Sequence, residues 1–213
     1  MDKYENLSTD IRLGSPNSNY VPGLSKGRAI FSDQNLWAMR PRRFFMSSKI
    51  PTLHLMCGKI ASGKSTLSAQ LAALEQAIVI AEDDWLEALY QDHLSSIADY
   101  VRCMSKLRSI IGPHVVSLLN SGVSVVLDFQ ANTIVSRKWM RKILDQTNAD
   151  HKLHVIDVPD EVCIARLHAR NAQGNHPFAA TEDQFRQVNK HFVSPSSDEG
   201  FDIVLHKYGM PGE

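Results

Sequence analysis

The string Gly58-Lys-Ile-Ala-Ser-Gly-Lys-Ser65 has the spacing GxxxxGKS, which is typical of phosphate-binding loops. Its glycines allow a tight turn whose backbone N–H groups converge on phosphate oxygens, and the helix that follows adds the positive end of its dipole. In such a loop Lys64 reaches the β- and γ-phosphates of a nucleotide, and the Ser65 hydroxyl binds Mg²⁺. A glycine turn with an incidental lysine is the alternative. We expect Mg-ATP to contact the loop and the residue after it, namely Gly58, Lys59, Ile60, Ala61, Ser62, Gly63, Lys64, Ser65 and Thr66.

Three acidic residues follow the apolar run Ala77–Ala81, in the string Glu82-Asp83-Asp84-Trp85. The carboxyl ends of parallel strands line the ligand crevice of an open sheet, where a carboxylate can accept a hydroxyl proton or help to hold a metal. Asp84 and Glu87 have the spacing of a helix N-cap and its capping-box partner, which favours Asp83 as the base. Asp84 as the base, or a purely structural acidic turn, stays open.

Asp128 closes another apolar run, Val123–Leu127, in the manner of a Walker B strand. A carboxylate in that position orients Mg²⁺, so we expect Ser65 and Asp128 to be the protein's contributions to a magnesium site. The alternative is an acidic residue that merely begins the next loop. Gln130, Asn132 and Thr133 come next, and they could contact an acceptor or cap the following helix.

Arg166 and Arg170 are four residues apart, which places them on one face of a helix. A guanidinium can bridge two phosphate oxygens and stays charged, so the pair could offset charge on a migrating phosphoryl group. The segment from Asn171 to Phe178 that follows has the composition of a lid. A solvated cationic helix face is the alternative, and His176 within the segment has no assigned partner.

The elements that must position these residues alternate between strands and helices. Strands are predicted at Thr52–Cys57, Ala77–Ala81, Val123–Leu127, Leu153–Val158 and Phe201–Leu205. Helices are predicted after the glycine loop, along a face with Ile97, Val101, Met104, Leu107 and Ile111, at Ile134–Leu144, from Asp160 to about Arg170, and after a Thr181–Gln184 capping box with Phe185, Val188 and Phe192 inward. Gly112-Pro113 is expected to break or kink the long helix. This alternation predicts an α/β fold with a mainly parallel sheet covered on both faces.

Composition places the chain among soluble globular proteins. Of its 213 residues, 43% are hydrophobic and 22% charged, which is enough to bury a core. A formal net charge of zero provides no overall basic field for long nucleic acids or membranes. The scattered cysteines Cys57, Cys103 and Cys163 argue against a disulfide framework, and no apolar run is long enough to span a bilayer. We therefore expect a cytoplasmic protein.

Domain organisation is predicted from the change in pattern near residue 48. Residues 1–47 are expected to be a poorly ordered extension, residues 48–208 the domain, and residues 209–213 a tail. The basic and aromatic string Arg40-Pro-Arg-Arg-Phe-Phe45 within the extension could instead be a docking arm. Tyr100, Arg102, Arg108 and Trp139 could line an acceptor site, and Tyr100 and Trp139 could equally belong to the core. His151 and His154 are expected to be structural.

With these motifs in this order, roughly Pro51 to Leu205 resembles the small P-loop kinases related to polynucleotide kinase, zeta toxin, gluconate kinase and chloramphenicol phosphotransferase. The resemblance implies a three-layer α/β/α P-loop fold with sheet order 2-3-1-4-5, ATP as donor and Mg²⁺ as cofactor. It matches Asp83 to the proton acceptor, Asp128 to the second acidic position, and Arg166 and Arg170 to the lid arginines. The stretch from Gln91 to Ser121 matches no acceptor-binding module of that group.

These patterns predict a phosphotransferase with Lys64, Asp83, Arg166 and Arg170 as its catalytic residues. We expect the acceptor to be a small hydroxyl metabolite or an antibiotic-like compound, with a 5′-hydroxyl nucleic acid held by a few local arginines as a second possibility. The alternative is a P-loop ATPase or nucleotide switch with no small-molecule acceptor. A guanine-specific switch is disfavoured because Asn189-Lys190 is followed by His-Phe rather than completing NKxD, and an ABC-type signature is absent from the sequence.

Overall fold

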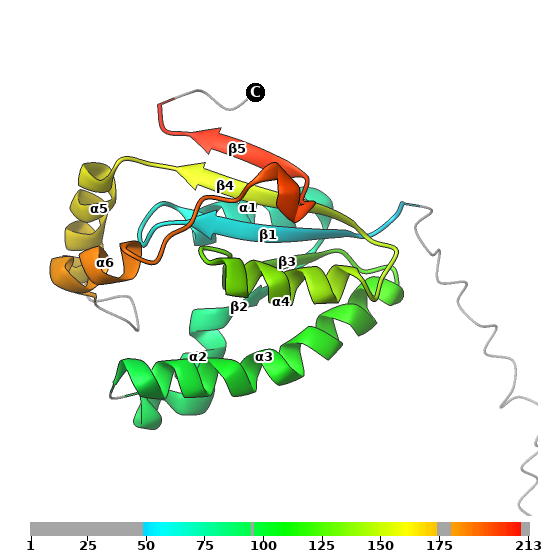
Figure 1. Cartoon of the computed structure of the whole chain (residues 1–213), viewed down its shortest axis with the longest axis horizontal. Coiled ribbons are helices and arrows are strands. Elements are labelled where there is room, and N and C mark those ends of the chain that lie inside the picture. The colour runs from blue at the N-terminus through cyan, green and yellow to red at the C-terminus, as the bar shows by residue number, and fades with distance from the viewer. Residues whose placement is uncertain (1–48, 95, 174–179, 210–213) are drawn as a thin grey trace, which may run out of the picture. The chain divides into compact units, whose positions relative to one another are not determined.

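The computed structural model describes residues 49–94, 96–173 and 180–209 (Figure 1). The expected extension over residues 1–47 with its Arg40–Phe45 string, His176, and most of the expected lid lie outside the described residues, as do residues 210–213. The described elements are, in order, β1 (Thr52–Gly58), α1 (Lys64–Glu75), β2 (Ile78–Ala81), α2 (Glu82–Tyr90), a short 3-10 helix (Gln91–His93), α3 (Ile97–Asn120), β3 (Val125–Gln130), α4 (Ile134–Leu144), β4 (Asp150–Asp157), α5 (Asp160–Gln173), α6 (Glu182–Asn189), a second 3-10 helix (Ser197–Glu199) and β5 (Ile203–Lys207).

The strands form one sheet of order β2-β3-β1-β4-β5, in which each neighbouring pair is parallel. This confirms the predicted order and the predicted parallel pairing. β1 lies at the centre, and every residue of it is buried. A central parallel strand is covered on both faces, which is why its sequence is a nearly continuous apolar run rather than an alternating one.

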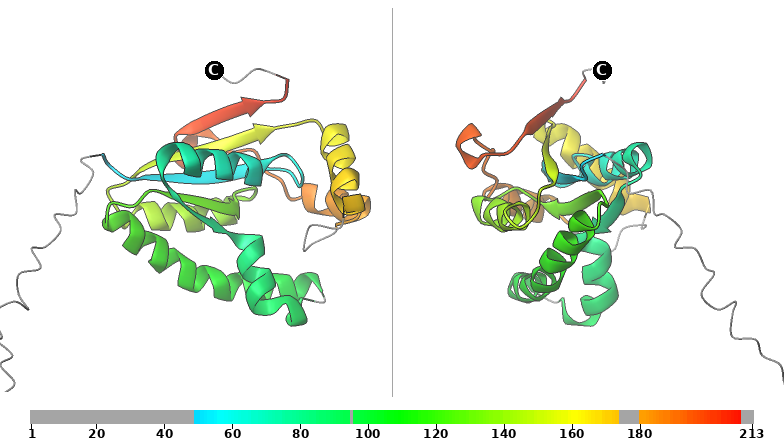
Figure 2. Two further views of the ribbon diagram at one scale, coloured as in Figure 1. Left: turned by 180° about the vertical axis from the view of Figure 1, so that it is seen from behind. Right: turned by 90° about the vertical axis from the view of Figure 1, so that its right-hand side faces the viewer.

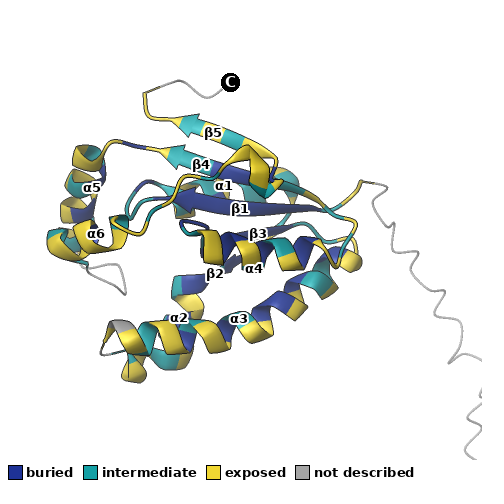
Figure 3. Cartoon of the chain, viewed as in Figure 1, coloured by how far each residue is buried: buried dark blue, intermediate teal, exposed yellow. Residues whose placement is uncertain are grey.

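Helices cover both faces of the sheet, as predicted (Figures 1 and 2). α1 packs on β1, β2 and β3 from one side, whereas α4 lies on the other side with α3 beside it. Buried residues are concentrated in β1, β3 and the inward sides of α3 and α4 (Figure 3). α5 and α6 lie beyond the carboxyl ends of β1 and β4, where Cys163, Leu167 and Phe185 form a smaller core of their own (Figure 1).

The long helix α3 differs from its prediction in two ways. It runs through Pro113 as one helix, so of the two expected outcomes, a break or a kink, the break is wrong. Pro113 is exposed, and its ring therefore does not disturb the packed side of the helix. The buried stripe consists of Cys103, Leu107, Ile111, Val115 and Leu119. Val101 was expected on this face but is exposed, because the buried residues follow an unbroken i, i+4 spacing that starts two residues later.

Strand boundaries shift most where the site begins. The strand predicted at Val123–Leu127, ending in Asp128, spans Val125–Gln130, so Asp128 lies inside β3 rather than at its end. β4 and β5 are likewise displaced from the predicted ranges by two or three residues at one or both ends. Phe185 in α6 is fully buried as predicted, whereas Val188 is exposed. Phe192 is partly buried against the main core, as predicted, but lies past the end of the helix. Boundary errors of this size are common because strand ends carry weak local signals.

A row of histidines joins the strands on one side of the sheet. His54 Nδ1 lies 3.0 Å from His154 Nε2, and His154 Nδ1 lies 2.9 Å from His206 Nε2. The row therefore links β1, β4 and β5 by side-chain hydrogen bonds. His151 Nε2 accepts a hydrogen bond of 3.2 Å from the backbone N–H of Asp202, which ties β4 to the start of β5. His151 and His154 thus lie in structural positions, as expected.

Candidate active site

The glycine loop connects β1 to α1 and depends on two of its glycines. Gly63 has φ of 109°, a left-handed conformation that favours glycine, and it is the N-cap of α1. A Cβ at Gly58 would lie 2.6 Å from Ser62 Oγ, so a side chain there would collide with the loop itself. The turn is closed by a hydrogen bond of 3.2 Å from the Ser62 N–H to the Lys59 carbonyl. The sequence therefore folds into a tight loop at the amino end of a helix.

Lys64 lies within the curve of this loop. Its Nζ donates to the carbonyls of Gly58 and Lys59, at 2.9 and 2.8 Å. Burial lowers the pKa of Lys64, while the nearby carboxylates of Asp128 and Asp83 oppose that shift. These interactions place both predicted acidic residues close to the loop lysine.

The acidic string forms the first turn of α2. Ala81 is the N-cap, and Glu82, Asp83 and Asp84 follow it directly. The predicted role of Asp84 as N-cap is therefore wrong, because β2 continues into the helix without an intervening loop. Carboxylates in a first helical turn interact favourably with the helix dipole. Asp84 is exposed and Asp83 half-buried, and both line the same cavity as the glycine loop.

Asp128 is beside the acidic turn because its strand pairs with β2. Asp128 and Ala81 are register partners in the β2–β3 pair, so Asp128 lies next to the residue that precedes the turn. Asp128 and Ser65 both line the cavity. Among the residues that the structure describes, no three acids, histidines or cysteines gather as a complete metal cage. One hydroxyl and one carboxylate suit Mg²⁺, which usually keeps several waters and completes its coordination with substrate phosphates.

Arg166 and Arg170 project from α5 over the other side of the cavity. Arg166 Nη1 donates to the Ser62 carbonyl at 3.1 Å, and its guanidinium lies 5.6 Å from the centre of the Tyr208 ring. Burial lowers the pKa of Arg170, and the carboxylate of Asp83 opposes this. Arg166 is therefore directed at the glycine loop and Arg170 at the acidic turn. The predicted pair lies on one helix face, as its spacing required.

Asn132 has a positioning role that its sequence context did not predict. Its Oδ1 accepts from the Gly58 N–H at 2.8 Å, and its Nδ2 donates to the Gly58 carbonyl at 2.9 Å. The capping role expected nearby belongs to Thr133, whose hydroxyl accepts from the Ser136 N–H at 3.1 Å. Gln130 lines the cavity, whereas Asn132 is committed to the backbone of the loop.

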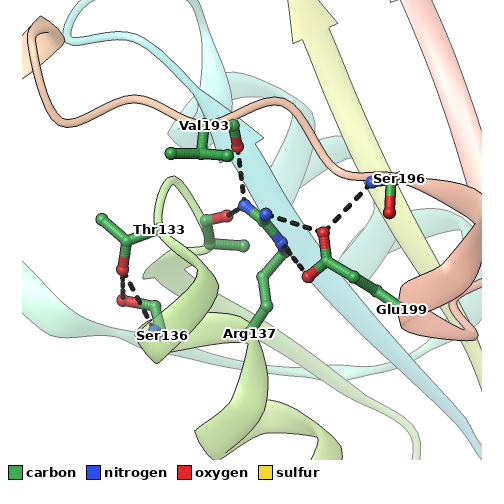
Figure 4. Close-up of polar contacts among 7 residues, drawn as sticks. Thr133, Ser136, Arg137, Val193, Ser196 and Glu199 are labelled. Atoms are coloured by element: carbon green, nitrogen blue, oxygen red, sulfur yellow. Dashed lines mark hydrogen bonds and ion pairs between the residues drawn. The ribbon is translucent and has the colours of Figure 1, made fainter.

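Arg137 fixes the segment after α6 to the segment that holds the loop (Figure 4). It is fully buried, and its Nε and Nη2 donate to the two carboxylate oxygens of Glu199 at 2.6 and 2.8 Å. Its Nη1 donates to the carbonyls of Ala131 and Val193 at 2.9 and 2.8 Å. The Val193 N–H in turn donates to the Asn132 carbonyl at 2.9 Å. No local motif indicated this clamp, because its partners are far apart in the sequence.

Of the four residues proposed for an acceptor site, Tyr100 alone lines the cavity. Trp139 packs on Phe129 in the core, and Arg108 stacks over the Trp139 ring at 5.0 Å. Arg102 is exposed and pairs with Asp99 at 2.8 Å. The acceptor-site hypothesis therefore fails for Arg102 and Arg108, whereas the alternative of a core position is confirmed for Trp139. Burial raises the pKa of Tyr100, and the carboxylates of Glu82 and Asp83 raise it further, so these groups lie near one another.

Glu82 also lines the cavity, although it is buried and was not predicted as a site residue. Its Oε2 accepts a hydrogen bond of 3.3 Å from the Gln130 N–H, and its Oε1 lies 3.8 Å from Arg108 Nη2. Burial raises the pKa of Glu82 to about 7, against the opposing effect of Arg108. The sequence did show an acidic residue, Glu82, directly after a strand, but the prediction chose Asp83 from the same string.

One open cavity of about 1500 Å³ lies at the carboxyl ends of β1, β2 and β3. It is lined by residues 60–65 of the glycine loop and by Glu82, Asp83, Asp84, Tyr100, Asp128, Gln130, Arg166 and Arg170. One wall is formed by the glycine loop and the start of α1, a second by β2, α2, α3 and β3, and the third by α5 and α6. The cavity is large enough for a nucleotide and a second small molecule side by side. It could therefore bring a phosphate-bearing ligand at the loop next to a carboxylate on α2.

Comparison with known proteins gives a consistent picture of the fold. A family model described as an AAA domain matches residues 53–195. A candidate kinase from Chloroflexus aurantiacus is similar in structure, with TM-score 0.61, 18% identity, and coverage of 75% of this chain and 86% of that one. The Mycobacterium tuberculosis APS kinase CysC, in complex with AMPPNP and APS, has TM-score 0.53 and 20% identity, with coverage of 76% and 90%.

A third similar structure is Kti12 from Chaetomium thermophilum in complex with ADP-AlF3, with TM-score 0.56, 15% identity, and coverage of 75% of this chain and 90% of that one. Identities this low establish a shared fold only. No match was found among curated proteins. Within the described residues, no helix is long and apolar enough to cross a membrane.

Proposed function

The chain belongs to the AAA-domain family and has a P-loop kinase-like fold, and from this premise we propose that it transfers the γ-phosphate of Mg-ATP to a hydroxyl acceptor. One observation supports this proposal above the others. The glycine loop, the carboxylates of Asp83 and Asp128, and the guanidiniums of Arg166 and Arg170 all line a single cavity. A nucleotide-binding module with no chemistry to perform would not need a carboxylate and two arginines around the phosphate site.

The nucleotide phosphates bind the backbone N–H groups of the glycine loop and the amino end of α1. Lys64 Nζ leaves the carbonyls of Gly58 and Lys59 and donates to phosphate oxygens instead. Because phosphate oxygens carry full negative charge, this exchange strengthens the hydrogen bonds of a buried ammonium. The adenine specificity in the proposal rests on the resemblance to ATP-dependent kinases rather than on an identified base pocket.

Ser65 and Asp128 would hold Mg²⁺ at the phosphates, Ser65 through its hydroxyl and Asp128 through its carboxylate. When bound, the ion supplies positive charge that offsets the charge on the β- and γ-phosphates. The position of Asp128 inside β3, rather than in a loop, gives its side chain a fixed direction from a paired strand.

Asp83 accepts the proton of the acceptor hydroxyl as that oxygen attacks the γ-phosphorus. The bond between the γ-phosphorus and the bridging oxygen breaks, and ADP leaves. Arg170, which interacts with Asp83, and Arg166, which contacts the loop at Ser62, offset charge on the migrating group. Asp83 is favoured over Asp84 because it is half-buried and its charge raises the pKa of Lys64, Tyr100 and Arg170, whereas Asp84 is exposed.

The test is release of ADP from Mg-ATP by purified protein, with and without a panel of hydroxyl compounds. The panel contains sugars, nucleosides, nucleotide-sugars, hydroxylated antibiotics and 5′-hydroxyl oligonucleotides. We expect one acceptor class to raise turnover, Lys64→Ala to abolish it, and Asp83→Asn to lower it by about 10²–10⁴-fold. Asp84→Asn is the matched control and should lower turnover far less.

A contrary outcome has a defined meaning. Turnover that requires Lys64 but responds to no acceptor, and that persists in Asp83→Asn, would overturn the transfer reaction. The chain would then be an ATPase or a nucleotide-dependent switch. Transfer that persists in Asp83→Asn but is lost in Asp84→Asn would instead exchange the roles of the two carboxylates.

A further inference from the structure

Asp128 lies in a bulge of β3. The strand pairs with β1 at Leu127 and again at Gln130, but the partners of these two residues are consecutive in β1. Asp128 and Phe129 therefore have no register partner in β1. Bulges are common next to active sites, where they redirect a side chain. Phe129 is buried in the core, whereas Asp128 is half-buried and lines the cavity.

The far end of this bulge is held by a side chain rather than by a neighbouring strand. β2 ends at Ala81, whose register partner is Asp128, so Gln130 lies beyond the last residue of β2. The Gln130 N–H instead donates to Oε2 of Glu82, the residue after β2, at 3.3 Å. Glu82 is 2% exposed, and its carboxylate takes the place that a strand carbonyl would otherwise occupy. A hydrogen bond to an ionised acceptor is stronger than one between neutral groups.

Arg108 holds the Glu82 carboxylate in this orientation. Its Nη2 lies 3.8 Å from Glu82 Oε1, which is too long for a hydrogen bond but close enough for charge attraction. The same nitrogen donates to Ser136 Oγ at 3.3 Å, and the guanidinium stacks over Trp139 at 5.0 Å. Arg108 therefore acts from a fixed position on α3, through the carboxylate oxygen that the Gln130 N–H does not use.

We propose that Glu82 is a positioning residue for Asp128: by bonding the Gln130 N–H it closes the bulge and fixes the direction in which Asp128 presents its carboxylate to Mg²⁺. This inference rests on the proposed function for the role of Asp128 at the metal. Glu82 needs no contact with a ligand, because it acts on the backbone two residues from Asp128. It also begins the helical turn that carries Asp83, so one buried carboxylate links that turn to β3.

The first test measures how much Mg²⁺ strengthens nucleotide binding. AMPPNP is titrated into the full chain at pH 8, with excess Mg²⁺ or with EDTA, and the ratio of the two dissociation constants gives the gain from the ion. Glu82 is mostly ionised at this pH, because burial raises its pKa only to about 7.

We expect a gain of at least about tenfold in the wild type and its near-complete loss in Glu82→Met, because loss of a group that orients a metal ligand lowers metal affinity by about 10–100-fold. Affinity in EDTA should change by less than about threefold, because the glycine loop and the amino end of α1 hold the phosphates.

Two further variants separate position from charge. Glu82→Gln removes the negative charge but keeps an oxygen that can accept from the Gln130 N–H, so it should retain most of the Mg²⁺ gain. Asp128→Asn should lose the gain by itself, and adding Glu82→Met to it should have little further effect, because Glu82 acts through Asp128. Glu87→Met is the matched control, because Glu87 is on the same helix and is not among the cavity-lining residues.

The second test needs no nucleotide and follows hydrogen exchange of the Gln130 backbone amide by NMR. In the wild type this amide should exchange at least about tenfold more slowly than an unstructured amide, and in Glu82→Met most of that protection should be lost. The Ala131 amide, which donates to the Met56 carbonyl at 2.9 Å, should change much less. In Glu82→Gln the Gln130 amide should stay protected. If Glu82→Met does not fold, the wild type and Glu82→Gln decide by these two measurements.

The inference is overturned by the absence of a Mg²⁺ gain in the wild type, by an unchanged gain in a folded Glu82→Met, or by its near-complete loss in a folded Glu82→Gln. An unprotected Gln130 amide in the wild type, or a further loss when Glu82→Met is added to Asp128→Asn, also overturns it. Failure of the proposed reaction is distinct from these results. A chain that shows the Glu82 dependence but transfers phosphate to no acceptor retains the inference and overturns the reaction. A chain that transfers phosphate with a Mg²⁺ gain independent of Glu82 does the reverse.

Discussion

Asn132 and Gly58 are joined by two hydrogen bonds, one in each direction between a side-chain amide and a backbone peptide group. Gly58 is the last residue of β1 and the first of the glycine loop, so this pairing fixes where the strand ends and the loop turns. The register between β1 and β3 is interrupted just before it, between Leu55 and Met56. The backbone at the start of the glycine loop is therefore held by the side chain of Asn132, which lies in the loop between β3 and α4.

Asn132→Ala should weaken both stability and nucleotide binding. The substitution leaves the buried N–H of Gly58 without its partner and removes one of the two donors to the Gly58 carbonyl, which keeps Lys64 Nζ, so we expect unfolding free energy to fall by about 1–3 kcal/mol. ATP affinity should fall because the loop loses its anchor. Urea denaturation and ATP titration measure the two effects, with exposed Asn148→Ala as the control. An Asn132→Ala protein that binds ATP as tightly as the wild type would contradict the anchoring role.

The clamp between Arg137 and Glu199 should be a major contribution to stability. Arg137→Met removes a donor from two backbone carbonyls and leaves the half-buried Glu199 carboxylate with the Ser196 N–H but without its counter-charge, and we expect it to lower unfolding free energy by about 3 kcal/mol. Arg137→Lys should not restore it, because an ammonium cannot reproduce the bidentate geometry. Lys138→Met, at the exposed neighbouring position, should change stability by no more than about 0.5 kcal/mol.

A double-mutant cycle with Glu199→Gln separates the pair from its surroundings. Because the two side chains contact directly, we expect a coupling energy of about 1–3 kcal/mol. Additive effects would mean that the carbonyls of Ala131 and Val193, rather than Glu199, are the important partners of Arg137.

Local patterns in the sequence predicted the parts of the site that lie next to a strand or helix boundary. Gly58–Ser65, Asp83 and Asp128 each follow or end an apolar run, and parallel sheets bring such positions to one edge. The sheet order came from the resemblance to P-loop kinases. By contrast, the Asp84 cap was wrong because a capping-box spacing does not reveal that a strand passes directly into its helix.

The positioning network was missed for a different reason. Asn132 contacts a residue 74 positions earlier, and Arg137 contacts one 62 positions later. Neither spacing has a local periodicity, so only the folded chain brings these groups together. The same holds for Glu82, whose partner Arg108 belongs to a helix that matched no known acceptor module. Tertiary pairing, not local propensity, decides these positions.

The histidine row should make the protein sensitive to mild acid. Burial lowers the pKa of His54, whose Nε2 lies 3.4 Å from Glu75, and burial together with His54 and His206 lowers the pKa of His154 to about 4. In the unfolded chain these histidines take up protons near their ordinary pKa of 6.5, whereas His154 in the fold does not until about pH 4. The unfolded state thus binds more protons in this window, so stability falls as pH falls through it.

We expect His154 to account for a loss of at most about 3 kcal/mol on going from neutral pH to pH 4, because one pKa unit corresponds to about 1.4 kcal/mol. His154→Gln should reduce the loss, most clearly above the range in which carboxylates titrate. Urea denaturation at a series of pH values measures it, with exposed His114→Gln as the control. Wild-type stability that is flat down to pH 5 would rule out this effect.

The two arginines of α5 should differ in their kinetic roles. Arg170 interacts with Asp83 and has a buried Nε that no described group accepts from, so Arg170→Met should lower kcat by about 10²–10³-fold with little change in the KM for ATP. Arg166 donates to the Ser62 carbonyl of the glycine loop, so Arg166→Met should raise the KM for ATP by about fivefold through the loss of one hydrogen bond of about 1 kcal/mol.

Steady-state kinetics with the acceptor identified by the panel separates these effects. Arg186→Met is the matched control, because Arg186 lies on the exposed side of α6 and pairs with Glu182. If Arg170→Met and Arg166→Met change only KM, and to the same extent, both arginines act in ground-state binding and neither stabilises the migrating phosphoryl group. A drop in kcat confined to Arg166→Met would instead exchange their roles and place the reacting phosphate nearer to Ser62 than to Asp83.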